Sequence, residues 1–260
     1  MEEQVFHLAC TPEQVGAYVF LPGDPGRVPA IASYLESAKK VAQNREFTTY
    51  TGTLHGVAVS VTSTGIGGPS AAIAMEELVQ LGAHTFIRVG TCGAMQPDID
   101  PGTLLIPSGA IRAEGTSREY LPVEFPAVPD YTILNALTEA AEALCFPYRV
   151  GVVHSKDSFY GQHDPDSMPV APMLKNNWNA WKQGGALGSE MESATLFTVA
   201  ATRHVRCGAV LQTLWNQEKD KVHPGETKPA DAMTDAIRVA VFAMDTLIQQ
   251  DLTGKPAPEP

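Results

Sequence analysis

Apolar and polar positions follow two distinct patterns along the chain. Short runs rich in β-branched and other apolar residues predict strands at 17–22, within 54–65 (ending near Ser63), and at 84–89, 102–111, 148–155 and 206–216. Between these runs, apolar residues at helical spacing predict helices at 27–37, 70–82, 130–144, 190–202 and 229–250.

This alternation of strands and helices predicts the architecture. It favours an α/β fold, in which a mostly parallel, twisted central sheet is flanked by helices. A chain of 260 residues can form one large domain or two small ones, and we find no internal repeat and no linker-like stretch. We therefore expect a single domain over residues 1–252 and a disordered, proline-rich tail over 253–260.

Composition and charge narrow the classes of protein that the chain can represent. The net charge of −11 argues against a nucleic-acid partner, and the apolar runs are too short to cross a membrane. The acidic, polar N-terminus does not resemble a secretory signal. Four scattered cysteines without metal-ligand spacing are typical of reduced thiols, so we expect a cytoplasmic protein.

Ligands of such folds bind beyond the carboxyl ends of the strands. Five stretches follow predicted strands: GDPGR, TGIGGPS, RVGTCGA, SKDSFYGQ and WNQEKD. The glycines of TGIGGPS would allow close approach of an anion to the next helix, although an ordinary strand-to-helix turn explains them equally well. The stretch matches neither the dinucleotide-binding nor the P-loop pattern.

Arg88 lies inside an apolar strand, where a buried guanidinium needs an anionic partner. A structural ion pair is one explanation. Arg27 and Arg45 also lie in or beside loops, and Thr91 adds a hydroxyl shortly after Arg88. In an acidic chain, three arginines placed in this way favour a phosphate site.

Two further stretches offer groups that could bind a nucleoside. In DSFYGQH, Phe159 could stack on a flat ring and Gln162 could pair with its edge, unless they are a core residue and a turn residue. In GSEMESATLF, Glu190 and Glu192 flank Met191; a carboxylate matches the ribose diol, but acids also favour a helix N-terminus. A phosphate site, a ring-stacking site and a site for the ribose diol together suit a nucleoside and phosphate.

In these motifs the sequence resembles the uridine phosphorylases, within the wider nucleoside phosphorylase family. The resemblance covers residues 5–250 and includes, in order, VFHL, LPGDPGRV, REFTTYTG, TSTGIGGPS, EELVQLGAHTFIRVGTCGA, EFPAV, FYGQH and SEMESATLF. It implies a pentosyltransferase of pyrimidine salvage. This enzyme would cleave uridine with phosphate, through an oxocarbenium-like transition state, to free base and ribose 1-phosphate. It also implies a hexamer built as a trimer of dimers.

The resemblance also assigns roles to individual residues. The phosphate contacts implied are Gly23, Arg27, Arg88 and Thr91, with Arg45 from a neighbouring subunit; the three arginines are the implied catalytic groups. Ribose would bind Met191, Glu192 and the neighbour's His7, and the base would bind Cys92, Gly93, Phe159, Gln162 and Glu190. No cofactor is implied beyond a monovalent cation such as potassium, near Glu46, Ile66 and Ser70.

The sequence departs from the family pattern at the base. Many uridine phosphorylases carry an arginine shortly after the GQ pair, whereas this chain reads GQHDPDSMP. Uracil recognition would then depend on Gln162, on water, on Lys219 or on another group. Purine-cleaving relatives have a catalytic aspartate where this chain has Asn216. A phosphorylase of different base specificity, a nucleoside hydrolase and a non-catalytic nucleoside-binding or dinucleotide-binding protein remain alternatives.

Overall fold

A computed structural model describes residues 4–222 and 233–254 of the chain. The strands are β1 (Tyr18–Pro22), β2 (Glu36–Asn44), β3 (Phe47–Leu54), β4 (Val57–Thr62), β5 (Thr85–Ala94), β6 (Leu104–Ala113), β7 (Tyr148–Lys156), β8 (Gly188–Glu190) and β9 (Arg206–Asn216). The α-helices are α1 (Val28–Ala32), α2 (Gly68–Gln80), α3 (Tyr131–Ala143), α4 (Phe159–His163), α5 (Ala171–Gln183), α6 (Ser193–Arg203), α7 (Gln217–Val222) and α8 (Thr234–Thr253). Short 3₁₀ turns occupy Pro12–Gln14, Pro25–Arg27, Thr116–Glu119 and Pro165–Ser167.

The strands form one sheet in the order β2-β3-β4-β1-β5-β8-β7-β6-β9. Its central pairings, β4 with β1, β1 with β5, β5 with β9 and β7 with β6, are parallel. The hairpins β2–β3 and β3–β4 add antiparallel strands at one edge. The expected α/β fold with parallel central strands is therefore confirmed.

One half of the sheet closes on itself. Strand β5 pairs with both β8 and β9, while β8, β7, β6 and β9 are joined in series, so these five strands form a ring. Apolar side chains of these strands pack together as a small core that includes Leu105, Val153 and Leu211. The ring brings the ends of β5, β7 and β8 together.

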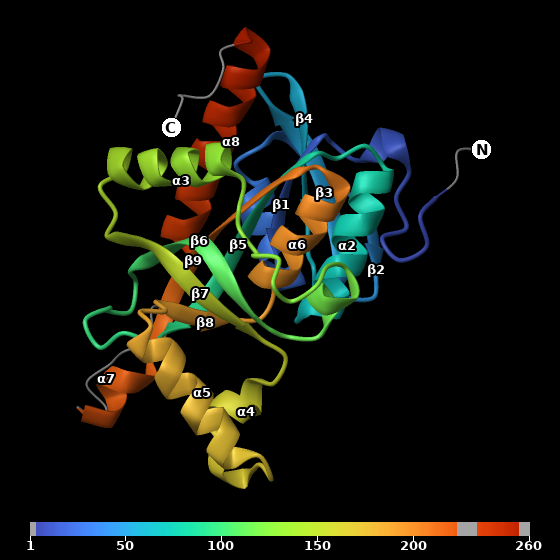
Figure 1. The fold of residues 1–260 in the computed structure, drawn as a ribbon. Helices are drawn as coiled ribbons and strands as arrows, with labels where there is room; N and C mark the ends of the chain where they lie inside the picture. Colours follow the sequence, from blue (N-terminus) through green and yellow to red (C-terminus); the bar gives the residue numbers. More distant parts are fainter. Residues whose placement is uncertain (1–3, 223–232, 255–260) are drawn as a thin grey trace.

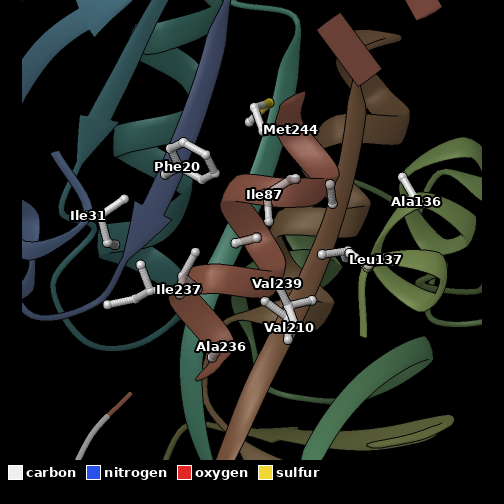
Figure 2. Close-up of a cluster of buried hydrophobic side chains, with 14 of the residues drawn as sticks. Phe20, Ile31, Ile87, Ala136, Leu137, Val210, Ala236, Ile237, Val239 and Met244 are labelled. Atoms are coloured by element: carbon white, nitrogen blue, oxygen red, sulfur yellow. The ribbon is translucent and has the colours of Figure 1, made fainter. Parts of the chain in front are cut away.

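Helices cover both faces of the sheet. Helices α3 and α8 lie on one side and α2 and α6 on the other, while α4, α5 and α7 gather at one end (Figure 1). Strand alternation divides the core accordingly, because Phe86 packs with the α2 and α6 side and Ile87 with the α3 and α8 side. Figure 2 shows the cluster on the α3 and α8 side, in which Phe20 of β1 and Val210 of β9 lie near Val239 and Met244 of α8.

Several predicted elements are confirmed, and others are wrong or were missed. The predicted helix 27–37 is wrong beyond its first half: α1 spans only Val28–Ala32, and tight turns after it lead into β2 at Glu36. Strands β2 and β3 were missed, because β2 is largely exposed and lacks an apolar alternation. The predicted strand within 54–65 is confirmed as β4, which ends at Thr62, and His55 and Gly56 turn the chain into it from β3.

The predicted helix 190–202 also needs correction. Glu190 ends strand β8, and α6 begins only at Ser193. Helices α4, α5 and α7 were not predicted. The last predicted helix, 229–250, corresponds to α8, although its first residues lie outside the described part of the chain. Most of the predicted tail also lies outside it, while Thr253 still belongs to α8.

Candidate active site

A pocket with a volume of about 800 Å³ opens at the carboxyl ends of the central strands. All five stretches that follow predicted strands contribute to its wall, from Gly23 after β1 to Trp215 near the end of β9. Of the predicted site residues, the following line it: Gly23, Arg27, Glu46, Ile66, Arg88, Thr91, Cys92, Gly93, Phe159, Glu190, Met191 and Glu192. The pocket therefore lies where the sequence predicted it, beyond the carboxyl ends of the strands.

One end of the pocket carries two arginines. Arg27 follows β1 in a 3₁₀ turn, Arg88 lies within β5, and both line the pocket together with Gly23 and Thr91. Burial lowers the pKa of Arg27, and the nearby positive charge of Arg88 lowers it further, against the opposing effect of Asp24. Two like charges that face one pocket favour an anionic ligand between them.

Arg88 is also held by two carboxylates, so the ion pair considered from its sequence position is present. Its Nε donates to Glu190 Oε2 at 3.1 Å, and its Nη2 lies 3.0 Å from Glu190 Oε2 and 2.5 Å from Glu192 Oε2. No described residue accepts a hydrogen bond from Nη1, so that nitrogen keeps its two donors. The carboxylates thus orient the guanidinium and leave one edge of it for a ligand.

The two glutamates differ in their electrostatic state. Burial by itself would raise the pKa of Glu190, but Arg88, the Ser155 hydroxyl and the backbone N–H groups of Glu192 and Ser193 outweigh it and lower the pKa. Burial and the charge of Glu190 instead raise the pKa of Glu192, against the effect of Arg88. Glu190 also accepts hydrogen bonds from the backbone N–H groups of Glu192 and Ser193, at the start of α6.

Glu192 connects the glycine loop to the arginine. Its Oε1 accepts a hydrogen bond from the backbone N–H of Gly67 at 2.6 Å, while Oε2 pairs with Arg88. Gly67 has φ 88°, a left-handed conformation that favours glycine. A carboxylate has about four lone-pair sites, so two remain available for hydroxyl groups of a ligand.

A glycine also makes room for the arginine. A Cβ atom at Gly90 would lie 2.8 Å from Cζ and from Nη2 of Arg88, and equally close to a methyl group of Leu211. Real side chains do not approach so closely. The guanidinium therefore folds over residue 90, and its position depends on the absence of a side chain there.

The other end of the pocket is more apolar. Phe159 is half exposed and stacks against His163, with ring centroids 4.3 Å apart. Burial raises the pKa of the Cys92 thiol to about 12, so this group is neutral at physiological pH. Gln162 does not line this pocket but an adjoining cavity of about 1070 Å³, and Lys156 and His163 lie at the boundary between the two.

Lys156 also lines the pocket, although no sequence pattern indicated it. This residue ends β7, and its Nζ donates to Ser189 Oγ at 3.0 Å. The hydroxyl of Ser189 in turn donates to Gln162 Oε1 at 2.7 Å, so the lysine is connected to a predicted base contact. A single lysine in the polar stretch SKDSF gave no sign of burial, because the neighbouring strand β8 comes from more than 30 residues further along the chain.

The two residues predicted to reach a neighbour's site do not line the pocket of their own chain. Arg45 is exposed at the β2–β3 turn, where its φ is 52°. His7 lies on the same surface, because Asn44 Nδ2 donates to its backbone oxygen at 2.8 Å. Glu77 of α2 anchors the His7 segment: it accepts hydrogen bonds from the backbone N–H groups of His7 and Leu8 and lies 2.6 Å from His7 Nδ1.

The residues predicted to hold a monovalent cation are close together. Ser70 Oγ lies 2.8 Å from Glu46 Oε1 and 2.5 Å from the backbone oxygen of Thr64, and the side chain of Ile66 is exposed. Within residues 4–222 and 233–254, no group of three or more His, Cys, Asp or Glu side chains is arranged to hold a metal ion. In the same ranges, no helix is long and apolar enough to cross a membrane.

Asn216 and Lys219 take structural roles. The side-chain amide of Asn216 donates to two backbone oxygens, of Gln96 and Ile99, and its Oδ1 accepts the N–H groups of Glu218 and Lys219. This fully buried side chain therefore holds the start of α7. Lys219 pairs with Asp100 and does not line the pocket.

An α/β fold with two arginines in a pocket at its strand ends is typical of proteins that bind small anionic ligands. Residues 17–247 match the model of the phosphorylase superfamily, and the chain belongs to this superfamily. It is 54% identical to a uridine phosphorylase from Treponema pallidum over 246 residues, which cover 95% of each chain. It is 45% identical to a uridine phosphorylase from Thermococcus kodakarensis (92% and 87% covered). Identity to a guanosine phosphorylase from Halorubrum lacusprofundi is 38% (93% and 98% covered).

Proposed function

We propose that this chain is a pentosyltransferase that cleaves uridine with inorganic phosphate, giving uracil and ribose 1-phosphate. Relatives named uridine phosphorylases, which match most of this chain at identities up to 54%, support this substrate. The observation that carries the proposal is that Arg27 and Arg88 line the same pocket as Glu192, whose carboxylate pairs with Arg88.

The reaction follows from this arrangement of charge. A phosphate oxygen forms a bond to C1′ of the ribose while the bond from C1′ to N1 of the base breaks, and the bonding electron pair leaves with the base. Arg27, the free edge of Arg88 and the hydroxyl of Thr91 would hold the phosphate. Glu192 would accept hydrogen bonds from the ribose hydroxyls, and phosphate would stabilise the positive charge that develops on the sugar.

The base end of the pocket favours a pyrimidine over a purine. Catalytic protonation of a purine would need an acid at position 216, but Asn216 is fully buried and its side chain is committed to backbone groups of the protein. The 38% identity to a guanosine phosphorylase nevertheless makes guanosine the competitor to test first.

We propose further that two subunits share each site within a hexamer. His7 and Arg45 lie on one surface of the chain without lining its own pocket, and could reach a neighbour's pocket. Exposed apolar side chains near these segments, such as Phe6 and Ile66, suit burial between subunits. Glu46 and Ser70 would hold a monovalent cation such as potassium at this interface. The free cysteines fit a cytoplasmic location.

The test is a phosphate-dependence assay. The purified protein is incubated with uridine, 2′-deoxyuridine, guanosine and inosine, with and without phosphate, and free base and ribose 1-phosphate are measured. The expected result is phosphate-dependent release of uracil, with ribose 1-phosphate in equal amount. Equal cleavage without phosphate would instead identify a hydrolase, and no cleavage would leave a binding protein.

A further inference from the structure

Lys156 is a buried cation that the reaction described above does not use. Its residue is only 7% exposed, and it lines both the nucleoside pocket and the adjoining cavity. Among the described residues that line the nucleoside pocket, Lys156 is the lysine and the arginines are Arg27 and Arg88. A buried lysine of this kind requires a compensating interaction or a function.

The other two cations are committed to the opposite end of the pocket. Arg88 is paired with both Glu190 and Glu192, and Arg27 lies 3.9 Å from Asp24. Lys156, in contrast, makes its hydrogen bond to a neutral hydroxyl, that of Ser189. No carboxylate of the described residues forms an ion pair with its Nζ. The lysine therefore has donors to spare for a ligand.

The surroundings of Lys156 place it at the base. Its Nζ lies 5.9 Å from the ring centroid of Phe159, the residue expected to stack on the base. The Ser189 hydroxyl, to which it donates, binds Gln162 Oε1, the residue expected to pair with the base edge. Since a hydroxyl has one hydrogen, Ser189 donates to Gln162 and accepts from both Lys156 and His154.

The chemistry of the proposed reaction calls for a cation at this position. When the bond from C1′ to N1 breaks, the departing pyrimidine receives the electron pair and spreads the negative charge over N1, O2 and O4. The base takes up a proton afterwards. A donor aimed at O2 or O4 stabilises the charge only as it develops, so it accelerates the bond cleavage itself.

We propose that Lys156 donates a hydrogen bond to a carbonyl oxygen of the departing pyrimidine, and that it replaces the arginine that this chain lacks after Gln162. This inference rests on the proposed phosphorolysis of uridine. Lys219, the other candidate suggested by the sequence, pairs with Asp100 and does not line the pocket.

The experiment compares leaving groups of different basicity. Wild type, Lys156→Met and Lys156→Arg are assayed with uridine and with 5-fluorouridine at saturating phosphate. Lys175→Met is the matched control, because Lys175 lines the adjoining cavity but is exposed and paired with Asp166. Thermal melting and the KM for phosphate report whether the fold and the phosphate end of the site are intact.

The expected result is a split between substrates. Lys156→Met should lower kcat/KM for uridine about a hundredfold, as the loss of one charge-stabilising donor does. The loss should be much smaller for 5-fluorouridine. Its departing 5-fluorouracil anion is less basic than the uracil anion, so its negative charge needs less stabilisation by the lysine. Lys156→Arg keeps the charge and should retain more activity than Lys156→Met, and Lys175→Met should match the wild type.

Two outcomes would overturn the role of Lys156. One is an equal loss for both substrates, which would mean that the lysine only positions Ser189 and Gln162. The other is no loss at all. Lys156→Gln keeps a donor for Ser189 without the charge, so it repeats the test if the methionine variant does not fold. Failure of the proposed function is distinct, because the wild type itself would then release no uracil from uridine in the presence of phosphate.

Discussion

Arg88 Nη2 lies 2.5 Å from Glu192 Oε2, although the two residues are 104 positions apart in the chain. This contact joins a residue predicted to bind phosphate to one predicted to bind ribose. A phosphate and a sugar held by these side chains would therefore be adjacent, as attack of one on the other requires. Glu190 holds the other side of the same guanidinium and fixes its orientation.

Replacement of Arg88 should disable phosphate use. Arg88→Ala removes a cation from the phosphate end and should lower kcat/KM at least about a hundredfold, equivalent to roughly 3 kcal/mol of transition-state stabilisation. It also leaves two buried carboxylates unpaired, so the melting temperature should fall. Steady-state kinetics with varied phosphate check the first effect. Arg149→Ala, at an exposed ion pair with Asp98, is the control and should change neither value.

Replacement of Glu192 should affect ribonucleosides most. Glu192→Gln weakens a charge-assisted hydrogen bond to the 2′-hydroxyl that is worth about 1.5–3 kcal/mol. The corresponding loss in kcat/KM should be larger for uridine than for 2′-deoxyuridine, which lacks that hydroxyl. Both substrates are compared in both proteins. An identical loss would mean that Glu192 does not contact the 2′-hydroxyl.

A methyl group at residue 90 should displace Arg88. In Gly90→Ala the added Cβ would lie 2.8 Å from the guanidinium, so overpacking should cost about 1–3 kcal/mol of stability. The KM for phosphate should rise as well. Denaturant unfolding and phosphate titration measure the two effects. Gly115→Ala, where the nearest atom is 3.6 Å from the new Cβ, is the control. An unchanged KM would show that Arg88 is free to move aside.

Activity should decline on the alkaline side because of Lys156. Burial lowers the pKa of its amine, against the opposing charges of Glu190 and Glu192, while Cys92, His154 and His163 also face it. Its protonated form is the one required, so kcat/KM falls as pH rises through this lowered pKa. Lys156→Arg keeps its charge and should extend activity to higher pH. Titration of the substrate is common to both proteins, so identical pH profiles would contradict this prediction.

Shared sites should allow complementation. An Arg45→Ala protein and an Arg88→Ala protein are dissociated, mixed and reassociated. If each site takes Arg45 from a neighbour, a mixed dimer has one site with both defects and one with neither. Activity should then approach about a quarter of wild type for random pairing, because a symmetric dimer exchanges the same surface both ways. If Arg45 serves its own chain, verified mixed oligomers would regain nothing.

The sequence predicts the central strands and most of the pocket because those features are local. The apolar run around Arg88 already requires a partner for its guanidinium, and the turn after β1 already contains Arg27. Strand β2 was missed because its exposed, polar residues carry no periodic pattern. Its existence depends on pairing with β3, which a local pattern does not show.

Lys156 was missed for a similar physical reason. The predicted strand ended at residue 155, one position short of it, and the following stretch appears polar. The burial of Lys156 depends on β8, which pairs beside β7 only because the five-stranded ring closes. The shift of Glu190 from a helix to the end of β8 has the same origin.

Helix α2 connects the pocket to the segment that carries His7. Just before the helix, the backbone N–H of Gly67 donates to Glu192 in the pocket of the same chain. Ten residues later, Glu77 contacts His7 and so holds the segment that carries it. An α-helix rises 1.5 Å per residue, so the two contacts are about 15 Å apart along a stiff rod. If His7 serves a neighbouring subunit, a shift of Glu192 on sugar binding would be transmitted to the neighbour's site. The helix would then act as a lever for cooperativity between subunits.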